Sequence, residues 1–235
     1  MIRSKLSLVA ICAVGLGLAG PAFAQDYFLD GLISPRPVLI AKKPGPETGT
    51  DSPRCDIALY APLLAESSDD TPKLNDLILR HVGQGIKAYG LNCKKYLSAW
   101  LAYKVTRADK WTSMNIVLYV RPRETVKGGF ESLPMTIDTE RVNIVPLKAL
   151  FKSPNYLKIV DDQLSAHVLP AMAKKGVVYA FKPTTARQKF YLTAKDLVIC
   201  YDQYEIGPGV AGVVELPIPL ASLRRHLIPG LSPLR

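Results

Sequence analysis

Histidine, cysteine and acidic residues are scarce in this 235-residue chain, and each shortage excludes a kind of site. Only three histidines occur, His81, His167 and His226, and none forms a His-x-x-x-His or Glu-x-x-x-His pair of the sort that binds metal. The four cysteines include no Cys-x-x-Cys, and Gly-x-Ser-x-Gly, P-loop and dinucleotide motifs are missing. The chain is therefore expected to be no enzyme and to need no metal or cofactor.

Basic residues outnumber acidic ones by 30 to 20, which gives a net charge of +10. They are spread along the chain in pairs rather than in one stripe interleaved with aromatic residues, so a nucleic-acid partner is not expected. The positive charge instead favours attraction to anionic material. Hydrophobic residues make up 48% of the chain, enough for a folded core.

The first 24 residues have the pattern of a secretory signal peptide. A basic start with Arg3 and Lys5 precedes an apolar run, which ends in the small-residue site Ala22-Phe23-Ala24. The alternative is a retained anchor, because residues 6–24 are barely long enough to span a bilayer. We expect cleavage, a periplasmic or secreted protein, and a mature charge of +10 − 2 = +8.

Residues 25–54 hold five prolines with little periodicity, which predicts an exposed tether in front of a domain at residues 55–235. Three cysteines remain in the mature chain. We predict a Cys55–Cys93 disulfide, because both residues flank short, exposed junctions. Cys200 lies inside an apolar strand and is expected to be a buried thiol.

The domain at residues 55–235 shows both helical and strand patterns. Thr71-Pro72 and Ser153-Pro154 each begin an apolar stripe of helical spacing, and Pro219 begins a short third one. Alternating residues predict a hairpin of strands over 97–105 and 114–120, with the turn at 107–110. Further strands are predicted at 130–139, 177–181, 189–193, 197–201 and 213–216. The expected fold class is α+β, a mostly antiparallel sheet with helices packed on one face.

Three segments resemble, in order, the RsiV-type C-terminal domain of bacterial envelope proteins. They are Met135-Thr-Ile-Asp-Thr-Glu-Arg-Val142 with Pro146-Leu-Lys-Ala-Leu-Phe151, then Phe190-Tyr-Leu-Thr-Ala-Lys-Asp-Leu-Val198, then Tyr204-Glu-Ile-Gly-Pro-Gly-Val-Ala-Gly212 with Val214-Glu-Leu-Pro-Ile218. The resemblance covers roughly residues 55–227. It departs at Lys127-Gly-Gly-Phe130, where many members carry a histidine.

The family occurs in anti-sigma factors that sense lysozyme, beside polysaccharide deacetylase domains, and alone in exported proteins of unknown function. The resemblance implies an exported, non-enzymatic binding module of the cell envelope; the alternative is an enzyme or accessory domain acting on cell-wall glycan. The expected partner is an envelope protein or an anionic wall component. Lysozyme is disfavoured, because lysozymes of the usual kind are basic, like this chain.

The segment 201–210 is the strongest candidate for a binding loop. Tyr201 and Tyr204 offer apolar rings with polar tips, Glu205 offers a charge, and Pro208 lies between two glycines that shape a turn. We predict Tyr204, Glu205, Pro208 and Tyr201 as ligand-binding residues. The alternative is that Gly207, Pro208 and Gly209 only form the turn while Tyr204 packs on the sheet.

Overall fold

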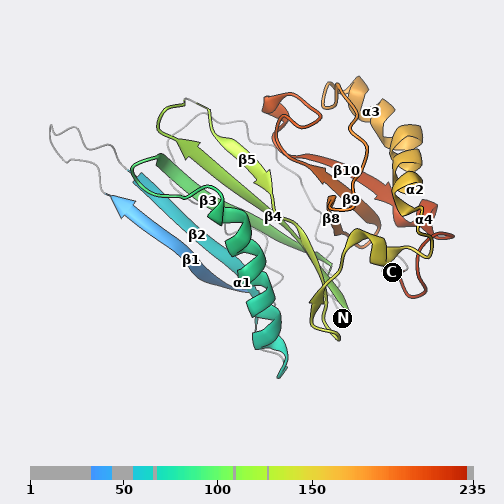
Figure 1. Cartoon of the computed structure of the whole chain (residues 1–235), viewed down its shortest axis with the longest axis horizontal. Coiled ribbons are helices and arrows are strands. Elements are labelled where there is room, and N and C mark those ends of the chain that lie inside the picture. Colours follow the sequence, from blue (N-terminus) through green and yellow to red (C-terminus); the bar gives the residue numbers. More distant parts are fainter. Residues whose placement is uncertain (1–32, 44–54, 66–67, 108–109, 126, 232–235) are drawn as a thin grey trace, which may run out of the picture.

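The computed structural model describes residues 33–43, 55–65, 68–107, 110–125 and 127–231, and it has the expected α+β fold (Figure 1). The predicted signal peptide, residues 1–24, lies outside the described residues. The strands are β1 (Ile33–Lys43), β2 (Cys55–Leu64), β3 (Tyr96–Arg107), β4 (Trp111–Pro122), β5 (Gly129–Ser132), β6 (Met135–Asp138), β7 (Asn143–Ile144), β8 (Lys189–Leu192), β9 (Asp196–Tyr201) and β10 (Val214–Pro219). The helical elements are α1 (Thr71–Lys87), η2 (Leu147–Leu150), α2 (Tyr156–Gln163), η3 (Leu164–Val168), α3 (Leu169–Lys174), η4 (Gly209–Ala211) and α4 (Leu220–Leu223).

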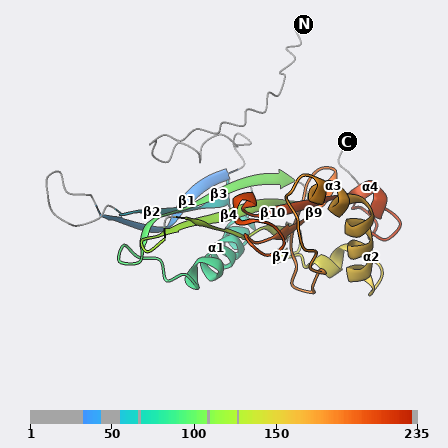
Figure 2. The same cartoon turned by 90° about the horizontal axis from the view of Figure 1, so that it is seen from above.

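The larger sheet has seven strands in the order β1-β2-β3-β4-β6-β7, with β5 also paired to β4. All pairs are antiparallel except β2 with β3, whose parallel pairing requires the crossover that α1 supplies. The start of α1 at Thr71-Pro72 confirms the prediction. Its stripe of Leu74, Ile78, Val82 and Ile86 is buried against one face of this sheet, and Figure 2 shows α1 on that one side.

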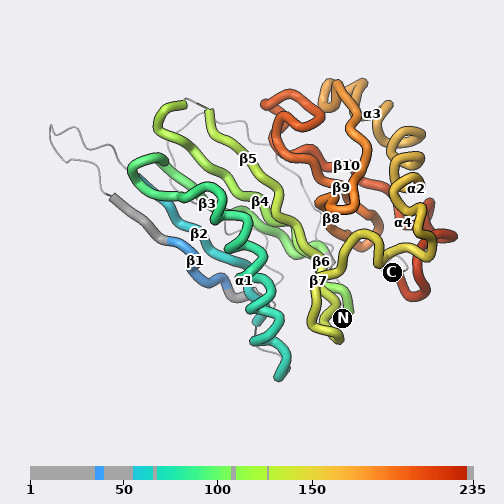
Figure 3. Tube along the Cα trace, in the orientation of Figure 1, coloured from blue at the N-terminus to red at the C-terminus, as the bar shows by residue number. Residues whose placement is uncertain are grey.

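The smaller sheet has three antiparallel strands in the order β10-β9-β8. Its core side packs against α2, η3 and α4 in a second hydrophobic cluster. Figure 3 traces the chain from β6 and β7 into this second half. The helical stretch over residues 156–174 widens into a π-turn at η3, which ends two residues before Pro170. Proline has no amide hydrogen to continue the α-helical ladder.

Side chains of the larger sheet bind the edge of β8. The amide of Leu192 donates to Ser113 Oγ at 2.8 Å, and Thr106 Oγ1 donates to the Leu192 carbonyl at 2.6 Å. Ser113 is fully buried, at the junction of β4 with β6 and β8. Both backbone groups of Leu192 therefore have partners although β8 pairs with only one strand.

Two expectations about secondary structure need correction. Residues 33–43 form edge strand β1, paired with all of β2, so that part of the predicted tether belongs to the sheet. Residues 177–181 form no strand, because the amides of Tyr179 and Ala180 both donate to the single carbonyl of Ile206. A ladder would need alternating partners on a neighbouring strand.

The Cys55–Cys93 disulfide is present, with its Cα atoms 5.5 Å apart, and Cys200 is a buried free thiol. Burial and the nearby Glu215 carboxylate raise the pKa of the Cys200 thiol, which disfavours the reactive thiolate. No helix among the described residues has both the length and the apolar character to cross a membrane.

Prolines mark the outer edges of both sheets. Edge strand β1 contains Pro35 and Pro37, and edge strand β10 contains Pro217 and Pro219. Such positions suit proline, which cannot donate a hydrogen bond to a neighbouring strand.

Candidate functional site

The loop of residues 202–212 joins β9 to β10, and some of its side chains bind the fold while others face the solvent. Asp202, Gln203 and Glu205 are all half-buried and hydrogen-bonded to the fold. Tyr204 alone among these four points outward, with 59% of its surface exposed. The loop is therefore built to present one aromatic ring.

Asp202 and Gln203 bind this loop to edge strand β5. The amide of Ser132 donates to Asp202 Oδ1 at 2.9 Å, and the amide of Phe130 donates to Gln203 Oε1 at 3.1 Å. These are alternate residues of β5, so the two side chains take the place of a neighbouring strand. Gln203 Nε2 also donates to the Gly209 carbonyl at 2.6 Å, which closes the loop on itself.

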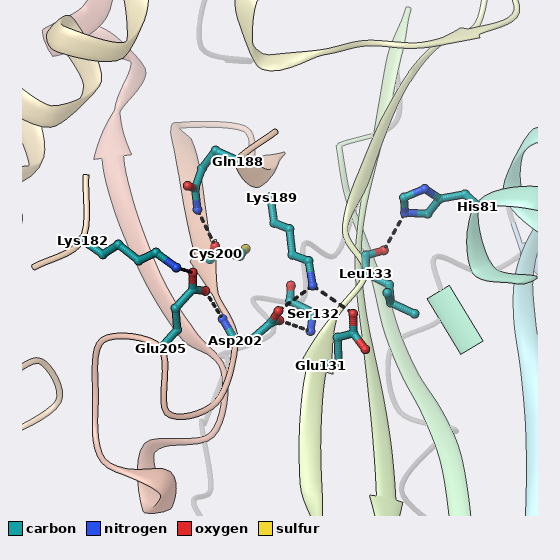
Figure 4. Close-up of polar contacts among 10 residues, drawn as sticks. All are labelled: His81, Glu131, Ser132, Leu133, Lys182, Gln188, Lys189, Cys200, Asp202 and Glu205. Carbon is teal, nitrogen blue, oxygen red and sulfur yellow. Dashed lines mark hydrogen bonds and ion pairs between the residues drawn. The ribbon is translucent and has the colours of Figure 1, made fainter. Parts of the chain in front are cut away.

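Lys189 on β8 strengthens this attachment with charge, as Figure 4 shows. Its Nζ lies 2.7 Å from Asp202 Oδ2 and 3.1 Å from Glu131 Oε1. Burial acts to lower the pKa of Lys189, but the Asp202 and Glu131 carboxylates outweigh it and hold that pKa above its ordinary value. The lysine therefore stays charged and joins the loop, β5 and β8.

The backbone of Tyr204 is in the left-handed region, with φ +69°. Residues with a side chain avoid this region, and one held there is strained. The Tyr204 ring lies directly over Gly209, where a β-carbon would overlap it. Gly209 therefore makes room for a ring that the strained backbone directs outward.

Tyr204 and Gln203 form one wall of an open groove of ≈ 530 Å³. The other wall is the turn after β4. The groove is lined by Val120, Pro122, Thr125, Lys127, Gly128, Gly129, Gln203 and Tyr204. Gly128 and Gly129 add no side chain to the lining, and the exposed Lys127 supplies a cation. This arrangement offers an aromatic face, apolar carbon and a positive charge to a ligand.

The four predicted ligand-binding residues have different places. Tyr204 is exposed at the groove. Glu205 accepts from the Asp202 amide at 3.0 Å and from Lys182 Nζ at 2.6 Å, so it holds the loop's shape. Pro208 is half-buried in the turn.

Tyr201 needs correction, because it is fully buried at the end of β9 and its hydroxyl donates to the Lys182 carbonyl at 2.7 Å. It faces the core of the smaller sheet and is no surface contact.

Sequence reasoning missed Asp202 and Gln203, whose role depends on β5, some 70 residues away. The only local sign of this role was that both residues are polar and lie between two tyrosines. His81 lies outside the residues that line the groove: burial lowers its pKa, and its Nε2 lies 3.3 Å from the Leu133 carbonyl. Over the residues that the structure describes, no three His, Cys, Asp or Glu side chains are grouped to hold a metal.

Known proteins match this chain in three ways. Residues 148–221 match the family described as "Protein of unknown function (DUF3298)". The anti-sigma-V factor RsiV of Bacillus subtilis (strain 168) is 31% identical over 108 residues, and the match covers 42% of this chain and 38% of that protein. The chain thus matches well under half of RsiV.

Two solved structures share the fold. A DUF3298 family protein from Pseudomonas aeruginosa PAO1 has a TM-score of 0.57 at 18% identity, covering 88% of this chain and 100% of that one. A DUF3298 family member from Bacteroides fragilis NCTC 9343 has a TM-score of 0.56 at 16% identity, covering 84% and 94%. Residues 148–221 thus match the model of the DUF3298 family, and the resemblance to RsiV-type proteins that the sequence motifs indicated is confirmed.

Proposed function

We propose that this protein is an exported, non-enzymatic binding module of the cell envelope, with the Tyr204 groove as its binding site. The observation that carries the proposal is the exposed, strained ring of Tyr204. Three neighbours with inward side chains hold it in place. Strain of this kind persists where the surrounding structure enforces it, and it clusters at binding sites.

The location in the envelope rests on separate support. The signal-peptide pattern of residues 1–24 and the likeness to RsiV both favour export. The Cys55–Cys93 disulfide suits an oxidising compartment. We therefore place the module in the periplasm or outside the cell.

The partner that the groove suits best is an anionic component of the envelope, either a wall polymer or a protein. Lys127 supplies a cation in the groove, and the chain without residues 1–24 carries a net charge of +10 − 2 = +8. A basic lysozyme lacks that complementarity. Titration calorimetry with lysozyme at physiological salt tests this ranking, which a complex of micromolar or tighter affinity would overturn.

The alternative of an enzyme acting on cell-wall glycan draws support only from the family's deacetylase neighbours. Among the described residues that line the groove, none is a histidine, aspartate or glutamate, and the amide of Gln203 is neither an acid nor a base at ordinary pH. Incubation of the purified protein with peptidoglycan, followed by assay of released acetate and sugar, tests this alternative. Turnover that Tyr204→Ala abolishes would establish the enzyme and overturn our proposal.

The decisive experiment compares capture from envelope extract by the wild type, Tyr204→Ala and Tyr60→Ala. Tyr60 is a matched control, because it is 40% exposed on β2 and lies outside the groove. Loss of an anchoring tyrosine weakens binding by about 2 kcal/mol, or about 30-fold. We expect that loss for Tyr204→Ala alone, with an unchanged melting temperature. Equal capture by both variants, or a large fall in melting temperature for Tyr204→Ala, would contradict the proposal.

A further inference from the structure

Residues 174–187, which connect α3 to β8, combine exposed rings with exposed cations. Tyr179 is 68% and Phe181 38% exposed. The segment contains four basic residues and no acidic one; they are Lys174, Lys175, Lys182 and Arg187. All four are exposed. We call residues 174–187 the basic connection.

The basic connection is held in a fixed shape, although only its first residue, Lys174, belongs to a helix or strand. The amides of Tyr179 and Ala180 donate to the Ile206 carbonyl at 3.1 and 3.3 Å. Further along, both the amide and the hydroxyl of Thr184 donate to Asp161 Oδ1, at 2.9 and 2.8 Å. The exposed rings are thus held on an ordered backbone. Their contact with water costs free energy, which burial against a partner would recover.

A third exposed apolar side chain lies on the loop to which the basic connection is bound. Val210, in η4, is 95% exposed, on the same loop as the Ile206 carbonyl. Lys182 also reaches this loop, where it pairs with Glu205. Three apolar side chains, Tyr179, Phe181 and Val210, therefore project from two joined segments beside basic residues.

The positive charge of the basic connection is mostly uncompensated. Among the residues that the structure describes, Lys182 is the one basic residue of the four that forms an ion pair, with Glu205. Anionic lipids would complement these cations, and each basic residue close to such a surface contributes about fivefold to binding.

We propose that the basic connection docks the protein on the surface of an anionic phospholipid bilayer. Tyrosine and phenylalanine rings lie favourably at the level of the lipid headgroups, and lysine stems can cover apolar surface while their amines stay in water. A projecting side chain such as Val210 can enter the lipid interface, because lipids deform around it and no preformed cavity is needed. An acidic protein is the competing partner, and the experiment separates the two.

The test is co-sedimentation of the purified protein with vesicles of neutral phosphatidylcholine, with and without anionic phosphatidylglycerol. The charge variant is Lys174→Glu with Lys175→Glu. Its control is Lys148→Glu with Lys152→Glu, which changes the net charge by the same amount at two exposed lysines near η2. The ring variant is Tyr179→Ala with Phe181→Ala, and its control is Tyr60→Ala. All variants share residues 1–32, so binding through that segment cancels.

We expect the wild type to bind only vesicles with phosphatidylglycerol, and less at high salt. The charge variant should bind about 25-fold more weakly or worse, at about fivefold for each lysine lost, and the ring variant about tenfold more weakly. Both controls should stay near the wild type. Equal losses in the charge variant and its control would overturn the proposal, because net charge alone would then explain binding. Binding to soluble polyglutamate without binding to vesicles would overturn it in favour of an acidic protein.

Discussion

At the scale of single residues, Tyr204 shows how the fold sustains an unfavourable conformation. Its φ of +69° is stabilised by the hydrogen bonds of Asp202, Gln203 and Glu205 rather than by its own preference. Only glycine adopts this region without steric cost.

Tyr204→Gly and Tyr204→Ala both remove the ring, but only glycine relieves the backbone. We expect the glycine variant to have the larger free energy of unfolding, by about 1 kcal/mol, because a β-carbon in the left-handed region costs about 1–2 kcal/mol. Urea denaturation of the two variants measures the difference. A more stable alanine variant would show that position 204 carries no strain.

His81 gives the protein a dependence of stability on pH. Burial lowers its pKa from the ordinary 6.5, the neighbouring Lys189 adds to this effect, and the Leu133 and Pro134 backbone opposes it. The unfolded chain therefore binds a proton more readily than the folded one near that pH. The free energy of unfolding should fall as pH drops through about 6.5, and no such penalty exists well above it.

Comparison of urea denaturation at pH 7.5 and 5.5 tests this expectation. His81→Gln should reduce the fall in stability, whereas His167→Gln, at an exposed position, should leave it as in the wild type. Identical pH dependence in the wild type and His81→Gln would assign the effect to other groups.

At the scale of elements, the buried hydroxyl of Ser113 makes one of the hydrogen bonds that join the two sheets. Ser113 Oγ accepts from the Leu192 amide and lies 2.8 Å from Thr136 Oγ1. Ser113→Ala leaves the amide of an edge strand buried without a partner, and such a group costs about 1–3 kcal/mol. Thermal and urea unfolding should show this loss, while Ser222→Ala, at an exposed position, should change stability by no more than about 0.5 kcal/mol. A neutral Ser113→Ala would mean that β8 is held by packing alone.

Local patterns predicted the elements whose partners are close in sequence. The Thr71-Pro72 start and its apolar stripe predicted α1, and the alternation on either side of residues 107–110 predicted the β3–β4 hairpin. Both depend on contacts along one helix or across one turn. β1 was missed because its prolines are typical of a tether, and its own sequence does not reveal the pairing with β2 that makes it a strand.

The same limit explains the errors near the site. Val177, Tyr179 and Phe181 alternate as in a strand, but alternation does not reveal that the amides of Tyr179 and Ala180 share one carbonyl, that of Ile206. Tyr201 and Tyr204 looked equivalent in sequence. Only the end of β9 between them, which directs Tyr201 into the core, separates an internal residue from an exposed one.

At the scale of the whole molecule, the Cys55–Cys93 disulfide joins the start of β2 to the segment before β3 and spans α1, across a separation of 38 residues. In the chain-entropy model a loop of this length contributes about 3–4 kcal/mol to stability. Replacement of both cysteines by alanine should lower the free energy of unfolding by that amount, as measured in urea. A loss well under 1 kcal/mol would indicate that α1 already restricts this part of the unfolded chain.

The prolines at the two sheet edges bear on how copies of the protein behave toward one another. An exposed strand edge is a template on which a second chain can add, the first step toward aggregates. Pro35 and Pro37 interrupt the donors of β1, and Pro217 and Pro219 interrupt those of β10. The inner edges are occupied, since Asp202 and Gln203 cover β5 while Ser113 and Thr106 cover β8. At high protein concentration, a neighbouring molecule would find few free backbone donors on these four strands. We therefore expect the protein to stay monodisperse at concentrations where proteins with exposed strand edges aggregate.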